Sequence, residues 1–405
     1  MFRSSFLFLS LFLTFSVQGA RFTFESAVQH ALSHNPDLAA ARFSIVEAQG
    51  RLIQSGRWSN PELESDWKPN VRGTEFTFGI GFVQKFPLTN RLRLEKAVSQ
   101  AEITVAEAEV RAAEVKLATA VRTAGVKLLS LQESKALQEQ QRASSQELAA
   151  VAAKIAERGE GSEWEAAQFE LEAQQHALEL LQLDAERAAL EGAVRALLGV
   201  ADSKSVEFTG RLPAVTEPDS GRPELAGRPD YQAAHARIEA AQQGLALAKA
   251  QRWEDASVGL GMEWEHNDDA GVGLEKERMV GVRFSLPLPF WNKNEGKIAE
   301  SEATVSRVEK EAEALAAKVR AEASAALGEM KAARRILKEI SNTLLPKAQE
   351  IEAKMVGFYK QAQPGTPLAE VLRAGEKRQA LELAHLSALR DYHLARIRLQ
   401  AALGH

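Results

Sequence analysis

The stretch ASVGLGMEWE, residues 256–265, departs from the helix-forming composition of the surrounding chain, which is rich in Ala, Glu, Leu, Lys and Gln. Its large apolar residues, Val258, Leu260, Met262 and Trp264, occupy alternate positions, and the positions beside them hold Ser, Gly or Glu. Successive side chains of a β-strand point to opposite faces, so the alternation predicts a strand with one apolar and one small or charged face. A half-buried strand of a soluble sheet has the same pattern, and other segments must separate the two cases.

Three further segments alternate in the same way: NPELESDW (60–67), TEFTFGIGFVQKF (74–86) and ERMVGVRFSLPL (277–288). Five of the six tryptophans lie at the ends of the four segments, and they are Trp58, Trp67, Trp253, Trp264 and Trp291. Tryptophan at strand ends is typical of the aromatic girdles of a membrane barrel, and a length of about 9–12 residues suits a tilted membrane strand. A soluble sandwich with aromatic residues at its rims is the alternative.

The number of strands sets a condition on a membrane sheet. Every backbone polar group inside a bilayer must be paired, and four strands are too few to close a barrel from one chain. Several chains must therefore pool their strands. Three copies would give a twelve-stranded barrel with Glu62, Glu64, Glu263 and Glu265 facing a wet lumen.

Very long helices are predicted beside the strands. Between residues 92 and 158 there is no proline and one glycine, Gly125, so a single helix there would be about 100 Å long at 1.5 Å per residue. A second long helix, residues 296–361, contains Pro346, which should kink it or end it early. Helices of this length predict a coiled coil or a barrel of packed helices.

The chain repeats one plan twice. A proline-led helix, a hairpin, a very long helix, a turn and a return helix occur in the same order in both halves. The expected units are a first repeat at 21–200 (hairpin 58–88, helices 92–158 and 162–198), a linker at 201–227, and a second repeat at 228–405 (hairpin 253–290, helices 296–361 and 367–403). The linker is rich in Pro, Gly, Ser and Asp and contains one strand-like stretch, SVEFTG at 205–210.

The first 20 residues are typical of a signal peptide. One early base, Arg3, precedes about ten apolar residues and then small ones, with cleavage expected before Ala20 or Arg21. A membrane anchor helix is the alternative, but it needs about 20 apolar residues. The chain has no cysteine, which removes disulfides and a lipid-bearing N-terminal cysteine.

Several classes of site are not supported by the sequence. A net charge of −5 without a basic stripe argues against nucleic acid, and HExxH, GxSxG and GxxxxGK[ST] motifs are absent, so neither an enzyme nor a cofactor is predicted. The pair His30 and His34, and the turn HNDDAG at 266–271, have metal-binding side chains, but the polar face of a short surface helix and the needs of an exposed turn explain both. Met262 and Met279 are too few for a copper relay.

The duplicated order, together with HNPDLAAAR (34–42), RGEGSEWEAAQ (158–168), RPDYQAA (228–234) and QPGTPLAEVLRA (363–374), resembles the outer-membrane efflux proteins, the TolC family, over residues 22–404. The passage SLPLPFWNKNEGKIAE (285–300) looks most like the heavy-metal, Czc-type branch. The resemblance implies a mainly α fold with a membrane β-hairpin pair. It also implies a homotrimer in the outer membrane of a Gram-negative-type cell, whose twelve-stranded barrel continues into a periplasmic helical barrel. No lipid anchor is expected.

The resemblance also implies roles for particular residues. The adaptor-docking helix tips match Gly159, Gly161, Ser162, Pro364, Gly365 and Thr366, although Gly and Pro chemistry alone would explain an ordinary turn there. A candidate periplasmic gate matches Glu370, and Arg373 stands where a second acidic residue occurs in some members.

The function implied is a passive duct for small solutes or metal ions. Its implied partners are a periplasmic adaptor protein, an inner-membrane pump such as one of the resistance-nodulation-division type, and outer-membrane lipid. The alternatives are the exit duct of a type I protein-secretion system and, in another class, a soluble exported coiled-coil scaffold.

Overall fold

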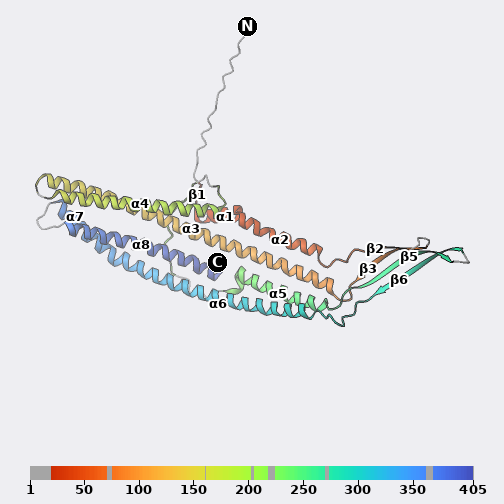
Figure 1. Ribbon diagram of the computed structural model, residues 1–405. Helices are drawn as coiled ribbons and strands as arrows, with labels where there is room; N and C mark the ends of the chain where they lie inside the picture. Colours follow the sequence, from red (N-terminus) through yellow and green to blue (C-terminus); the bar gives the residue numbers. More distant parts are fainter. Residues whose placement is uncertain are drawn as a thin grey trace, which may run out of the picture.

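A four-stranded sheet lies at one end of a long body of helices in the computed structural model (Figure 1). The structure describes residues 20–70, 75–159, 161–201, 205–217, 224–269, 273–361 and 368–404. The expected signal peptide therefore lies outside the described residues, apart from Ala20. The prediction of a mainly helical chain with a pair of β-hairpins is confirmed.

The elements follow the chain in two series. The first is β1 (Ala20–Phe22), α1 (Phe24–His34), α2 (Pro36–Gln54), β2 (Glu62–Pro69), β3 (Phe76–Phe86), α3 (Arg91–Glu157), α4 (Glu163–Leu198) and β4 (Val206–Phe208). The second is the 3-10 turn η1 (Leu225–Gly227), α5 (Pro229–Ala250), β5 (Ala256–Asp269), β6 (Gly273–Ser285), α6 (Glu295–Glu339), the π-helical turn η2 (Ile340–Leu344), α7 (Leu345–Lys360) and α8 (Leu368–Leu403). The helix α3 has 67 residues, which corresponds to about 100 Å.

The two hairpins join into one antiparallel sheet with the strand order β2-β3-β5-β6. The register sets Leu63 opposite Phe82, and Phe82 opposite Leu260. It also sets Gly81 opposite Gly261, and Gly261 opposite Gly281. Residues of one kind therefore form rows across the sheet, because directly opposite residues in a ladder share a face.

The junction between α1 and α2 is fixed by Asn35 and Gly199. The Asn35 side chain accepts a hydrogen bond from the backbone N–H of Leu38 at 2.8 Å and donates one to the carbonyl of Leu197 at 3.0 Å, so it caps α2 and binds the end of α4. Gly199 ends α4 at φ 65°, and a Cβ there would lie 2.3 Å from the carbonyl oxygen of His34. Only glycine fits this crossing.

A π-helical turn interrupts the second long helix just before the predicted proline. Pro346 lies in the first turn of α7, and the five residues before that helix form the π-turn η2. Proline has no N–H for the carbonyl four residues earlier, and within η2 the Leu345 N–H instead bonds the carbonyl of Ile340, five residues back. The chain thus continues through the proline as a distorted helix.

A two-stranded parallel sheet, β1 with β4, packs on the middle of α3. It brings Phe22, Val206 and Phe208 into one buried cluster with Val121 and Leu128 of α3. The strand-like stretch of the linker is therefore part of a core.

We expect the Gly125→Ala protein to be less stable than the Gly328→Ala protein by about 1–3 kcal/mol, the usual range for overpacking a core. A Cβ on Gly125 would lie 2.8 Å from ring atoms of Phe24 and Phe208, whereas a Cβ on Gly328, also inside a long helix, meets nothing within 4 Å. Both variants gain the same helix preference, so their difference isolates the clash. Denaturant unfolding followed by circular dichroism measures it, and equal midpoints would contradict the close packing of β4 on α3.

Candidate functional site

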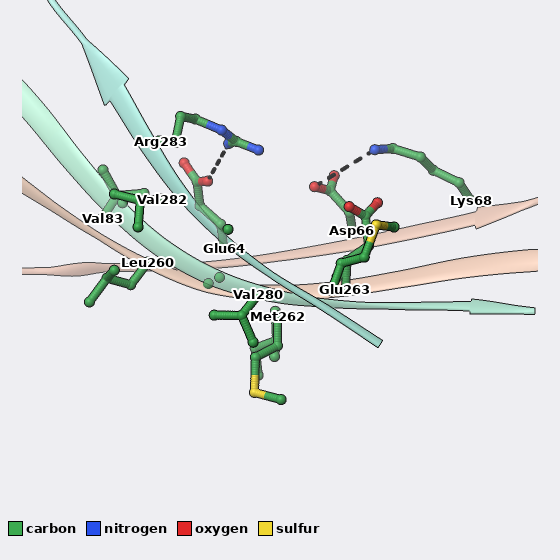
Figure 2. Close-up of a pocket in the computed structure, with 17 residues that line it drawn as sticks. Glu64, Asp66, Lys68, Val83, Leu260, Met262, Glu263, Val280, Val282 and Arg283 are labelled. Carbon is green, nitrogen blue, oxygen red and sulfur yellow. Dashed lines mark hydrogen bonds and ion pairs between the residues drawn. The ribbon is translucent and has the colours of Figure 1, made fainter. Parts of the chain in front are cut away.

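The two faces of the four-stranded sheet differ in chemistry. Large apolar side chains are exposed on one face, and they are Leu63, Phe82, Leu260, Met262, Val280, Val282 and Phe284. Figure 2 shows the charged side chains of Glu64, Asp66, Lys68, Glu263 and Arg283 on the other side of the strands from Leu260, Met262 and Val280. A face of exposed apolar residues this extensive is a surface for a lipid or protein partner.

The charged face is a trough with a floor of glycine. Arg283 of β6 forms an ion pair with Glu64 of β2 at 3.2 Å, although β3 and β5 lie between the two strands. Gly81 and Gly261 stand on those central strands near the pair and carry no side chain that would block it. The trough encloses about 430 Å³ (Figure 2). Its outer strands therefore curve toward each other over a small-residue floor.

Aromatic residues mark both ends of the apolar face. At the helix end, Trp58 packs edge-on against Phe86 with ring centroids 5.5 Å apart. At the far end, Trp67 stacks on Phe76 at 4.8 Å, and Trp264 stacks on Phe78 at 5.6 Å. The remaining predicted interface aromatics, Trp253 and Trp291, are exposed and lie at the helix end. The structure thus separates the five tryptophans into two groups, one at each end of the sheet.

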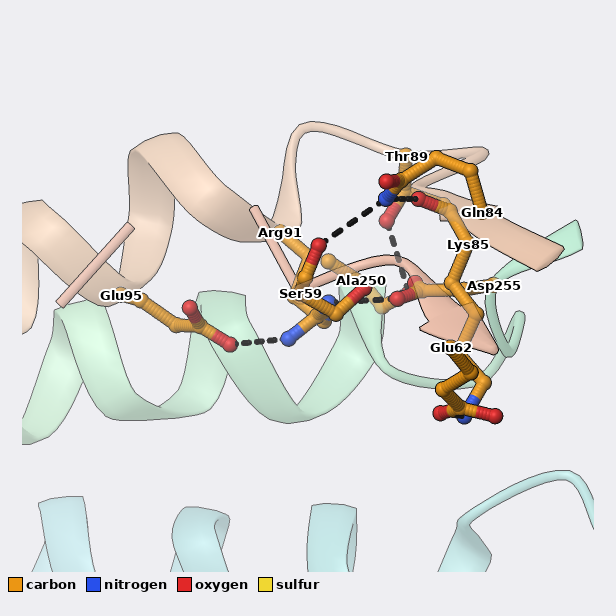
Figure 3. Close-up of polar contacts among 9 residues, drawn as sticks. All are labelled: Ser59, Glu62, Gln84, Lys85, Thr89, Arg91, Glu95, Ala250 and Asp255. Atoms are coloured by element: carbon orange, nitrogen blue, oxygen red, sulfur yellow. Dashed lines mark hydrogen bonds and ion pairs between the residues drawn. The ribbon is translucent and has the colours of Figure 1, made fainter. Parts of the chain in front are cut away.

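Ion pairs and hydrogen bonds hold the sheet on the helices (Figure 3). Arg91, the first residue of α3, contacts Asp255 before β5 at 2.7 Å and Glu95 at 2.5 Å. Thr89 donates a hydrogen bond to the carbonyl of Ala250 at the end of α5. The contacts Arg91–Asp255 and Thr89–Ala250 both connect the first half of the chain to the second. They therefore hold the start of α3 against the end of α5 and the start of β5.

The opposite end of the helices carries the predicted tips. Gly159 turns the chain after α3 at φ 75°, and Ser162 precedes α4 as its N-cap residue. Gly161 lies between them, and a Cβ on it would meet a methyl group of Ile155 at 2.9 Å. Pro364, Gly365 and Thr366 lie outside the described residues.

A buried cluster joins the four helices next to these tips. It contains Leu148, Ala152 and Ile155 of α3, Phe169 of α4, Tyr359 of α7, and Leu368 and Val371 of α8. The Tyr359 hydroxyl donates a hydrogen bond to Glu165 at 2.9 Å, and burial together with the Glu165 carboxylate raises the pKa of Tyr359 above its ordinary value. Lys360 forms an ion pair with Glu147 at 2.6 Å. The turn between α3 and α4 therefore lies next to a packed cluster.

The gate candidates Glu370 and Arg373 lie in the first two turns of α8, and both side chains are exposed. Neither makes an ion pair with another residue in the described part of the chain. Among the described residues, both charges therefore face solvent.

A buried charge network was missed by the sequence analysis. Arg378 of α8 contacts Glu352 of α7, pairs with Glu382 at 2.7 Å, and donates to the side-chain oxygen of Gln141 of α3 at 3.0 Å. Burial lowers the pKa of Arg378, but the carboxylates of Glu352 and Glu382 outweigh it and raise the pKa above its usual value. Beside this network, burial raises the pKa of Glu172 on α4. The network connects three helices at the base of the tips.

Among the described residues, no helix is both long enough and apolar enough to cross a membrane. No three or more His, Asp or Glu side chains there are grouped as a metal site. The rings of His30 and His34 stack on each other at 4.2 Å, and His266 stacks on Phe76 at 5.1 Å.

Solved structures share this arrangement of a two-faced sheet mounted on very long helices. CusC matches with a TM-score of 0.78 and 17% identity, over 94% of this chain and 92% of that one. VceC from Vibrio cholerae matches with 0.75 and 20%, over 94% and 96%. The CmeC outer membrane channel of Campylobacter jejuni matches with 0.76 and 16%, over 94% and 85%. At these identities the likeness shows the fold.

Residues 27–200 match the family model of the outer membrane efflux proteins. This match confirms the predicted resemblance to that family. No curated protein matches the sequence.

Proposed function

We propose that this protein is the outer-membrane channel of a tripartite efflux system. Three copies would pool their sheets into a twelve-stranded barrel and their long helices into a periplasmic tunnel. The chain would be a passive duct, since energy and substrate choice belong to an inner-membrane pump that reaches it through a periplasmic adaptor. The proposal includes export by a signal peptide at residues 1–20, and structural repeats at 21–200 and 228–405 joined by the linker 201–227.

One observation carries this proposal: the sheet exposes an apolar face on one side and a charged, glycine-floored trough on the other. A transmembrane barrel needs the first toward lipid and the second toward a water-filled lumen. The edge strands β2 and β6 carry unpaired backbone groups on their outer sides, which neighbouring copies would pair. The family assignment of residues 27–200 supports the same conclusion.

The test is extraction of the full-length protein from outer membranes, followed by mass determination in detergent. We expect release only by detergent, and a complex with the mass of three chains. Release of a monomer or dimer by a salt wash would overturn the proposal and favour a soluble coiled-coil scaffold. An exit duct for protein secretion would have the same fold. Transport of metal ions or drugs by the assembled system would identify an efflux channel and exclude a secretion duct. Metal ions are the substrate class favoured by the Czc-like passage at 285–300.

The helix tips Gly159, Gly161 and Ser162, with Pro364, Gly365 and Thr366, are proposed as the adaptor-docking surface. Glu370 and Arg373 are proposed to ring the tunnel mouth, where their exposed side chains on α8 would meet those of the other two copies. Alternating opposite charges in such a ring would close it through ion pairs between chains.

Replacing Arg373 by alanine is expected to raise the single-channel conductance of the reconstituted trimer and its preference for cations. The change leaves the Glu370 carboxylates without opposing charges at the narrow mouth. Lys377→Ala removes another exposed cation one turn further along α8 and is the matched control. Planar-bilayer recordings compare the two, and equal conductance in both variants would contradict a gate at Arg373.

A further inference from the structure

The apolar face of β6 continues beyond the end of the strand. The last ladder pair of β6 joins Ser285 to Ser257. Apolar residues nevertheless continue to occupy every second position after Val280, Val282 and Phe284. They are Leu286, Leu288 and Phe290, and Trp291 follows them. All four of these side chains are exposed, from 52% for Leu288 to 97% for Trp291. We call residues 286–291 the apolar extension.

The apolar extension has a defined backbone although it is not part of the sheet. Pro287 and Pro289 have no N–H to donate and hold φ near −65°, so the ladder of β6 cannot continue through them, and the chain bends at Phe290 and Trp291. The N–H of Phe290 bonds the carbonyl of Leu288 at 2.9 Å. After the extension, the Asn294 side chain donates to the carbonyl of Ala248 on α5 at 2.8 Å. The extension is therefore fixed at Ser285 and at Asn294.

The surroundings of the apolar extension match a phospholipid leaflet. All four strand-to-helix junctions lie at this end of the sheet (Figure 1), and Trp58, Phe86 and Trp253 lie at the other three. Exposed cations stand beside these aromatic residues: Arg57, Arg252 and Lys293. Aromatic rings with neighbouring basic groups are the usual composition of a protein surface at the level of lipid headgroups.

We propose that the apolar extension inserts into the periplasmic leaflet of the outer membrane, with Trp291 and Phe290 among the acyl chains and Lys293 at the phosphates. This inference rests on the proposed function, since the sheet must first enter the bilayer. The extension continues the lipid-facing surface of β6 beyond the barrel wall, in the direction of the periplasm. Each chain then holds the leaflet by apolar side chains that lie outside its strands.

The test uses tryptophan emission from the full-length trimer in vesicles of phosphatidylethanolamine and phosphatidylglycerol. Three single-tryptophan variants retain Trp291, Trp264 or Trp164, with phenylalanine at the other five positions. Trp264 reports on the sheet, and Trp164 on α4 is an exposed control far from the sheet. Brominated acyl chains quench tryptophan within the bilayer, and aqueous iodide quenches tryptophan in water. If the single-tryptophan variants do not fold, the Trp291→Phe variant replaces them. The difference between its emission and that of the parent protein is the emission of Trp291, and its response to the two quenchers gives the same information.

We expect brominated lipid to remove most of the emission of Trp291 and of Trp264, and to leave that of Trp164. Quenching of Trp264 alone, with Trp291 open to iodide, would overturn the inference and leave the proposed function standing. Trp291 protected from both quenchers would place the extension against a neighbouring chain and would also overturn it. If neither Trp264 nor Trp291 responds to brominated lipid, the proposed function fails as well.

Discussion

The Arg378→Ala protein is expected to lose about 3–5 kcal/mol of its free energy of unfolding, the usual loss when one partner of a buried ion pair is removed. Arg378 is 9% exposed, and the side chains of its partners Glu352 and Glu382 are 18% and 16% exposed. Alanine would leave two carboxylates in this site without their cation, and Gln141 without its donor. Desolvated charges of one sign at close range destabilise the packed state of α3, α7 and α8.

The matched control is Arg334→Ala, which removes an ion pair with Glu217 whose side chains are 40% and 83% exposed. Exposed pairs contribute about 0–1 kcal/mol, so this variant should unfold close to the parent protein. Denaturant unfolding of both variants in the same detergent gives the comparison. If Arg378→Ala unfolds at the same midpoint as Arg334→Ala, the network does not stabilise the base of the tips. Arg378→Met, which fills the volume without charge, separates loss of packing from loss of charge.

This network shows why part of the molecule was beyond sequence analysis. Only Arg378 and Glu382 carry a local signal, since they stand four residues apart on one helix. Gln141 is 237 residues from Arg378, and on helices rich in Ala, Glu and Lys its burial has no distinguishing pattern. Contacts that depend on which helix faces meet are set by packing, and packing is not periodic in the sequence.

The strands could be predicted from the sequence for the opposite reason. A period of two is a local property, so the apolar and charged faces could be predicted from residues 256–265 and the three related segments. The alignment of Gly81 with Gly261 could not be predicted, because it depends on the register between two hairpins, and these residues are 180 positions apart in the sequence. The ion pair of Arg283 with Glu64 depends on that same register.

Only one of the two shortest strands could be predicted. β4 lies within the strand-like stretch 205–210, whereas β1 has three residues, which is too few for a periodic pattern. The burial of Val206 and Phe208 of β4 in the cluster with Val121 shows that the stretch predicted as a linker contributes to the core. For Pro346 the expected kink was a local inference, and the π-turn that accommodates it follows from the missing N–H.

An arginine added to the apolar face of β6 should hinder insertion into the membrane, whereas an arginine added to the charged face should not. Val282→Arg is expected to reduce the amount of protein inserted in the outer membrane strongly, because arginine on the lipid face near the bilayer centre costs about 2–4 kcal/mol per chain. Val282 is 58% exposed on the apolar face, about midway between the two groups of aromatic residues. In a trimer this energy applies three times.

Gly281→Arg is the matched control, one residue earlier on the same strand and on the charged face. A Cβ on Gly281 meets nothing within 4 Å, so the added side chain has room beside the trough. In a barrel this arginine would enter the lumen, where water solvates it, and insertion should remain close to that of the parent protein. Three added cations would instead shift the ion preference of the channel toward anions, which bilayer recordings measure. Equal loss of insertion in both variants would mean that β6 does not separate lipid from water, and the shared barrel would have to be abandoned. If Val282→Arg alone fails to insert while Gly281→Arg alters ion preference, the two faces of one strand carry the two functions that a membrane duct requires.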